Sequence, residues 1–173
     1  LQEIKSVPEI LAVAPQIEEK VFLSYSEKNQ VAYLKAVDHT YTSVVQADKL
    51  IALGDWLSFD GADVVLGFGI AGNLGVGVYD YSTFLKLIVP KIKKQSLLDQ
   101  SPFKEVSTIV VGLYQINEDL DKKYVFSRIE VAQNLLELNP QEYSSLVLKT
   151  SSKISKEELS AKLVSKFEQP IKL

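Results

Sequence analysis

The chain has 173 residues, 46% of them hydrophobic and 24% charged, with a formal net charge of −3. This composition is typical of a globular protein with one domain or two small joined ones. The slight acidity gives no sign of a nucleic-acid partner, and the absence of Cys excludes disulfide and thiolate chemistry. Because the chain begins at Leu1 and contains no Met, we expect it to be a piece of a longer protein.

The first quarter of the chain alternates apolar and polar residues, which predicts extended structure. Residues 9–14 and 16–26 form a first extended segment, residues 26–29 a polar turn, and residues 31–37 a second strand, which together predict a hairpin. Residues 44–53 predict a helix that ends at Gly54. His39 is the only histidine, so we expect it at the surface rather than in a catalytic or metal site. Trp56, the only tryptophan, is expected to anchor the core or its boundary.

The segment Val64–Gly75 is the most glycine-rich part of the chain. Gly67, Gly69 and Gly72 match G-x-G-x-x-G after an apolar run, the pattern of a dinucleotide-binding turn. The context does not fit, because Gly75 ends the helix after about two turns and Lys and Pro stand where a ribose-binding acid is needed. We favour a short strand, then a short helix whose Ile70, Ala71 and Leu74 point inward, and glycines that serve packing and turns.

Residues 83–89 predict a strand that Pro90 ends, with Phe84, Leu85, Leu87 and Ile88 largely buried. Residues 91–104 then predict a loop, and a loop of this length inside a compact domain is often functional. It combines lysines with apolar residues, which suits a protein or lipid-like partner, although a solvated hairpin tip fits equally well. The candidate partner-binding residues are Lys91, Ile92, Lys93, Lys94, Leu97, Leu98 and Phe103.

The last third of the chain predicts a strand at 106–116, an acidic turn at 117–121 and a strand at 143–149. Ser127 with Glu130, and Ser155 with Glu158, have the spacing of capping boxes and predict two helix starts. The second helix has the apolar stripe Leu159, Leu163, Val164 and Phe167. This succession of strands and helices predicts an α+β fold with mixed sheets.

No catalytic constellation is present in the sequence. It lacks G-x-S-x-G, a P-loop, a metal-spaced His or Cys cluster, and a nucleophile beside a base. We therefore expect no enzymatic activity, no cofactor and no metal in this chain, and we interpret the acids at 117–121 as a solvated turn rather than a cation site.

The order of several segments resembles the periplasmic domain of MacB/LolC/LolE-type ABC-transporter permeases of the FtsX-like superfamily. These segments are Leu-Gly-Asp-Trp-Leu, Val-Val-Leu-Gly-x-Gly-Ile-Ala-x-x-Leu-Gly, Asp80, Val89-Pro90, Ile-Val-Val-Gly-Leu-Tyr and Asp-Lys-Lys-Tyr-Val-Phe-Ser-x-x-x-Ala-Gln-x-Leu-Leu. The likeness runs from about Leu1 to Lys149 and is greatest to the lipoprotein-releasing branch. It rests on order and spacing rather than on one specific motif.

The resemblance implies a non-enzymatic domain on the periplasmic side of the inner membrane, in a permease embedded there. In that family a Porter subdomain is formed by both chain ends and a Sabre subdomain is inserted between them, which here implies 1–58 with 120–173, and 59–119. ATP is hydrolysed by a separate subunit, and a second permease is a further partner. In LolC-like members a hairpin loop called the hook docks a soluble lipoprotein carrier, and residues 91–105 occupy its place, without a matching hook motif.

Three hypotheses follow from the sequence. The first is a transporter domain for lipoprotein release that handles cargo or its carrier. The second is a MacB-type efflux domain, or one that only transmits force. The third, a nucleotide-binding enzyme that uses Gly67–Gly72, is the most distant.

Overall fold

The computed structural model describes residues 4, 6–58, 60–91, 101–152 and 154–167. The strands of this part of the chain are β1 (Ile10–Tyr25), β2 (Lys28–Val37), β3 (Ile51–Gly54), β4 (Asp63–Gly67), β5 (Leu85–Pro90), β6 (Phe103–Tyr114), β7 (Tyr124–Arg128) and β8 (Ser145–Thr150). The helices are α2 (Tyr41–Val45), the 3₁₀ helix η1 (Ala47–Leu50), α3 (Phe68–Leu74), α4 (Glu118–Asp121), α5 (Ile129–Leu136) and α6 (Lys156–Phe167).

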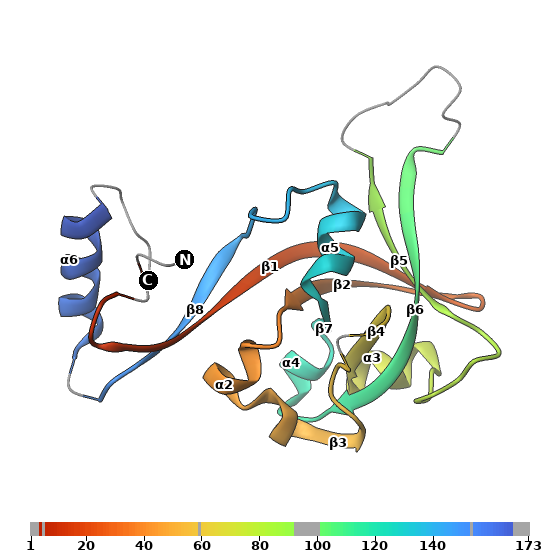
Figure 1. Ribbon diagram of the computed structural model, residues 1–173. Helices are drawn as coiled ribbons and strands as arrows, with labels where there is room; N and C mark the ends of the chain where they lie inside the picture. Colours follow the sequence, from red (N-terminus) through yellow and green to blue (C-terminus); the bar gives the residue numbers. More distant parts are fainter. Residues whose placement is uncertain (1–3, 5, 59, 92–100, 153, 168–173) are drawn as a thin grey trace.

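The strands form one mixed sheet of eight (Figure 1). Its path β2-β7-β4-β6-β5-β1 returns to its start because β1 also pairs with β2. β8 extends this ring by pairing with the first half of β1, and β3 pairs with the end of β6. The pairs β2–β7 and β4–β6 are parallel and the others antiparallel, which confirms the predicted α+β class with mixed pairing.

Two hydrophobic clusters lie against the central strands, one on each face. Val64 and Leu66 of β4 belong to the larger cluster with α3 and α5, and Val65 belongs to a second one with Tyr114 and Phe126. In β7, likewise, Val125 belongs to the larger cluster and Phe126 to the second one. A strand that is buried on both faces has no polar alternation, so β7 gives no period-two signal in the sequence.

The predicted hairpin, the helix after Gly67 and the strand before Thr150 are confirmed. β1 and β2 pair from Tyr25–Lys28 to Gln16–Val37. In α3 the buried residues are Ile70, Ala71 and Leu74, as predicted, and Gly75 ends the helix with a φ of 72°. This left-handed conformation favours Gly because the residue has no Cβ.

Three local predictions are wrong. Residues 44–53 are not one helix, because α2 ends at Val45, η1 follows, and β3 pairs with β6. Ser127 does not begin α5, because it lies inside β7 and the N-cap is Arg128. Phe84 is exposed rather than buried, since the inward residues of β5 are Leu85, Leu87 and Val89.

The second capping box is confirmed at the start of α6. The Glu158 amide donates to Ser155 Oγ over 3.1 Å, and the Ser155 amide donates to the Glu158 carboxylate over 3.2 Å. Leu159 and Leu163 of α6 are buried against Val7, Ile10 and Val13 in a third cluster, whereas Val164 is exposed. This cluster lies at the end of the β1–β8 pair, away from the ring (Figure 1).

The division into residues 1–58 with 120–173, and 59–119, stays a prediction. Strands from both parts share the sheet, because β4 pairs with β7 and β5 pairs with β1. Among the described residues, no helix combines the length and the apolar character that crossing a bilayer requires.

Candidate functional site

The predicted loop begins and ends on a described strand pair, β5 and β6. The Lys91 amide donates to the Pro102 carbonyl over 2.9 Å, and Phe103 stands opposite Pro90 in the register. The structure therefore places two of the candidate residues, Lys91 and Phe103, at the base of the loop. The other five, Ile92, Lys93, Lys94, Leu97 and Leu98, lie outside the described residues.

Beside this base, apolar side chains line up across neighbouring strands on the solvent face of the sheet. Phe22 stands opposite Val31 of β2 and opposite Ile88 of β5. Residues two apart in a strand share a face, so Pro90 and its partner Phe103 lie on this side as well. We call Phe22, Val31, Ile88, Pro90 and Phe103 the base patch. Its aromatic residues are well exposed, Phe22 at 42% and Phe103 at 54%.

A groove of about 770 Å³ opens along the base patch. It lies where the β1–β5 ladder ends, at the pair of Phe22 with Ile88. In the same register Val21 would stand opposite Val89, and the next hydrogen-bonded pair would be Lys20 with Pro90. Pro90 has no N–H to donate, so the ladder cannot continue there. The Lys20 amide donates instead to the Glu19 carboxylate over 2.9 Å. The residues that line the groove are Glu19, Lys20, Val21, Phe22, Val31, Ile88, Val89, Pro90, Phe103 and Leu136.

Two exposed ion pairs flank the groove. Lys86 contacts Glu105 across β5 and β6 at 2.8 Å, and Lys104 contacts Glu137 after α5 at 3.2 Å. Pairs as exposed as these stabilise a fold by only about 0–1 kcal/mol. Their charges are mutually neutralised, so these two pairs add little net charge beside the groove.

The glycine motif does not form a phosphate site in this structure. A Cβ added at Gly67 would collide with the backbone of Asp121, and one at Gly69 would collide with the Lys122 side chain. The close approach that these glycines permit is therefore that of the chain itself, at the end of α4. β4 pairs with β6 and β7 rather than with the next strand, β5, so the βαβ unit of a dinucleotide fold is absent.

The acidic segment after β6 is a capped turn. The Asn117 side chain accepts the Leu120 amide at 3.0 Å, and the buried Asp121 carboxylate accepts the Ile116 amide at 2.8 Å. A hydrogen bond from Lys122 lowers the pKa of Glu118. Within the described residues, no three His, Cys, Asp or Glu side chains are grouped as metal ligands. His39 is exposed, as predicted, and Trp56 packs on Phe126 with 5.2 Å between ring centroids.

Two tyrosine–aspartate hydrogen bonds fix the segment that precedes β5. The Tyr79 hydroxyl donates a hydrogen bond to Asp55, and this bond raises the pKa of Tyr79 to about 12. Asp80 accepts from the Ser82 hydroxyl and amide and from the Tyr25 hydroxyl, and these bonds lower its pKa from 3.8 to about 2. Asp80 thereby connects the end of β1 to the segment that leads into β5, the strand that carries the loop.

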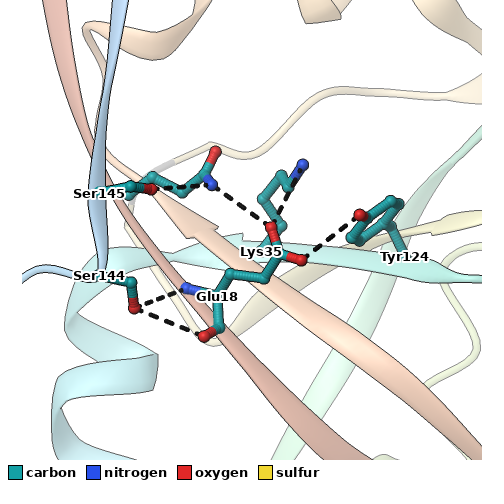
Figure 2. A network of polar contacts seen from close by, with 6 residues as sticks. Glu18, Lys35, Tyr124, Ser144 and Ser145 are labelled. Atoms are coloured by element: carbon teal, nitrogen blue, oxygen red, sulfur yellow. Dashed lines mark hydrogen bonds and ion pairs between the residues drawn. The ribbon is translucent and has the colours of Figure 1, made fainter. Parts of the chain in front are cut away.

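A polar network that the sequence did not predict joins β1, β2, β7 and the start of β8 (Figure 2). The Glu18 carboxylate contacts Lys35 at 3.7 Å and accepts the Tyr124 hydroxyl at 3.4 Å. Ser144 Oγ accepts the Glu18 amide at 3.1 Å. Ser144 lies 126 positions from Glu18, and a contact between such distant residues leaves no periodic signal in a single sequence.

The overall arrangement of the chain recurs in known structures. No protein-family model matches the chain, and no curated protein is detectably similar to it. The extracellular domain of the noncanonical ABC-type transporter YknZ from Gram-positive bacteria is similar over 97% of this chain and 82% of that one, with a TM-score of 0.65 and 13% identity.

Two further structures are similar over nearly the whole chain. The periplasmic region of MacB from Actinobacillus actinomycetemcomitans matches 98% of this chain and 73% of that one, with a TM-score of 0.63 and 14% identity. A domain of a putative permease from Porphyromonas gingivalis matches 99% and 69%, with a TM-score of 0.56 and 11% identity. The chain therefore has the fold of the extracellular and periplasmic domains of these ABC-transporter permeases.

Proposed function

We propose that this chain is the periplasmic domain of an ABC-transporter permease for lipoprotein release, and that the loop at 91–102 with the base patch docks the soluble lipoprotein carrier. The shared fold and the order of the sequence segments support the transporter part. The base patch is the observation that carries the docking part, because it places exposed apolar side chains at the foot of the hook-like loop.

The base patch has the properties of a docking surface. Phe22, Val31 and Phe103 are each 42–54% exposed although they adjoin a groove whose floor, Val21 and Val89, is buried. Contiguous exposed apolar residues mark interaction sites on soluble domains. Burying a Phe or Val side chain contributes about 1.5–3 kcal/mol, so two or three of these residues suffice to anchor a partner.

The rest of the transporter belongs to the same proposal. ATP is hydrolysed by a separate subunit on the other side of the membrane, a second permease completes the assembly, and the parent protein lies in the inner membrane. The domain contributes no catalytic group. It transmits the ATP-driven movement to the docked carrier.

A binding titration with the purified lipoprotein carrier of the same bacterium tests the proposal. We expect the wild-type chain to bind the carrier, deletion of residues 92–101 to abolish binding, and Phe103→Ala to weaken it about tenfold or more. Leu53→Ala is the matched control, because Leu53 is 49% exposed on β3, which pairs with the other end of β6. Circular dichroism of each variant establishes that the fold is intact.

Failure of the folded wild-type chain to bind the carrier would contradict carrier docking and favour a MacB-type efflux domain or a purely force-transmitting one. The similarity to the periplasmic region of MacB supports that second candidate. An efflux assay in which the 92–101 segment is replaced by a scrambled sequence separates these two, because a domain that only transmits force tolerates the replacement.

A further inference from the structure

The first half of β6 has one edge that no described strand covers. The opposite edge pairs with β5 from Phe103 to Thr108, whereas β4 joins β6 only from Ile109 onward. Figure 1 shows β5 and β6 rising together away from the rest of the sheet. The segment between Phe103 and Ile109 is therefore a strand with a free edge.

Contacts at the end of this segment fix which backbone groups point outward. The Ile109 amide donates to the Ala62 carbonyl on the β4 side at 3.1 Å, and the Val110 carbonyl accepts the Tyr79 amide on the β5 side at 2.8 Å. Successive residues of a strand direct their backbone groups to opposite edges. Glu105 and Ser107 therefore direct theirs to the free edge.

No described residue bonds to these outward groups of Glu105 and Ser107. Phe103, the next residue with the same orientation, is different, because Ser101 Oγ contacts both its amide at 3.3 Å and its carbonyl at 2.9 Å. The free edge thus offers two N–H donors and two C=O acceptors in strand register. The charged side chains of this segment, Lys104 and Glu105, contact Glu137 and Lys86 in ion pairs. They are therefore held by these partners, and Glu105 and Ser107 are exposed.

We propose that the edge of β6 at Glu105 and Ser107 is a strand-addition site, and that its occupant is an extended segment of the carrier. This inference rests on the proposed function and names the contact through which the carrier docks. The alternating partial charges of the edge complement an extended backbone, which alone supplies donors and acceptors at the same spacing. A strand added here runs beside Phe103 and the base patch, so backbone hydrogen bonds and apolar burial act on the same partner.

The test replaces an outward N–H without disturbing the β5–β6 ladder. Ser107→Pro removes a donor that points away from β5, a position where an edge strand tolerates proline. Ser107→Ala keeps the N–H and is the matched control. In the carrier titration we expect Ser107→Pro to bind about two- to tenfold more weakly, as loss of one hydrogen bond predicts, and Ser107→Ala to bind like wild type.

Hydrogen exchange on the wild-type chain provides a second measurement that needs no variant. We expect the amides of Glu105 and Ser107 to exchange fast in the free chain and to be protected in the carrier complex, whereas the Thr108 amide, which points toward β5, is protected in both. A carrier that binds with both outward amides still exchanging fast, or that binds Ser107→Pro with unchanged affinity, overturns strand addition and leaves the proposed function standing.

Absence of carrier binding by the wild-type chain overturns the proposed function and this inference together. A second copy of the chain on the same edge is a further outcome: a dimer in sedimentation that Ser107→Pro dissociates would assign the edge to self-association and overturn carrier binding there.

Discussion

Gly67 lies directly against the backbone of Asp121, where a side chain at residue 67 would have no space. The contact joins the start of α3 to the end of α4, and Asp121 in turn accepts the Ile116 amide. The first glycine of the pattern is thus required for packing between two segments that lie more than 50 positions apart.

We predict that Gly67→Ala destabilises the fold by about 3 kcal/mol, because the added methyl group must displace backbone rather than a flexible side chain. Gly72→Ala is the control, since an added Cβ there meets nothing within 4 Å, and removing Gly from a helix interior stabilises it by roughly 0.5–1 kcal/mol. Urea unfolding measures both. Equal stabilities of the two variants would contradict the role assigned to Gly67.

The Asp80 hydrogen bonds predict an acid-dependent loss of stability. Because the pKa of Asp80 is lowered from 3.8 to about 2 in the folded chain, its contribution is fully present above pH 4 and declines as the pH falls toward 2. Asp80→Asn should therefore show a smaller loss of unfolding free energy between pH 4 and 2 than wild type. The control is the same pH series on Asp60→Asn, which changes an exposed acid before β4. If the unfolding free energy of Asp80→Asn falls with pH as steeply as that of wild type, the prediction is refuted.

The Tyr79–Asp55 hydrogen bond predicts a loss of stability at alkaline pH, where the free energy of unfolding falls as the pH rises. The pKa of Tyr79 is raised from 10.0 to about 12, so its contribution is present below pH 10 and is lost as the pH rises through 12. Tyr79→Phe should reduce the loss of stability in this range. Tyr81→Phe, which changes a residue that is 64% exposed, is the control. Unfolding measured by circular dichroism from pH 9 to 12 distinguishes the variants.

The capping box at α6 predicts a local effect. Ser155→Ala removes the Oγ that accepts the Glu158 amide, and loss of such a cap costs about 1 kcal/mol. The amides of α6 should then exchange faster, with those of β4 unchanged, because the buried residues of α6, Leu159 and Leu163, belong to a cluster that β4 does not share. Ser127→Ala provides the comparison, since Ser127 caps no helix and should leave α6 exchange as it is in wild type.

Leu163→Ala and Val164→Ala form a matched pair in the same helix. Leu163 is 2% exposed and Val164 is 40% exposed. Truncating the buried residue should weaken the docking of α6 by about 2 kcal/mol or more, whereas the exposed one should change it by less than about 0.5 kcal/mol. Hydrogen exchange of α6 measures both, and similar protection in the two variants would contradict the assigned burial.

Much of the local structure could be predicted because the signals were local. The alternation of residues 16–37 identified the hairpin, the spacing of Ile70, Ala71 and Leu74 identified α3, and Ser155 with Glu158 identified the start of α6. The sequence also predicted the loop, because it lies between a strand that ends at Pro90 and a segment rich in β-forming residues. Whether its residues bind a partner stays a prediction.

The sequence by itself determined which short segments are strands and helices where one face is polar and the other apolar, because that contrast repeats with the period of the element. Only the tertiary structure decided that β7 is a strand, since burial on both faces removes the contrast, and that residues 51–54 pair with β6 instead of continuing a helix. It also decided that the ladder between β1 and β5 ends before Pro90, and which edge of β6 no described strand covers. These features depend on which strands meet, and the pairing of distant segments is not encoded in any local period.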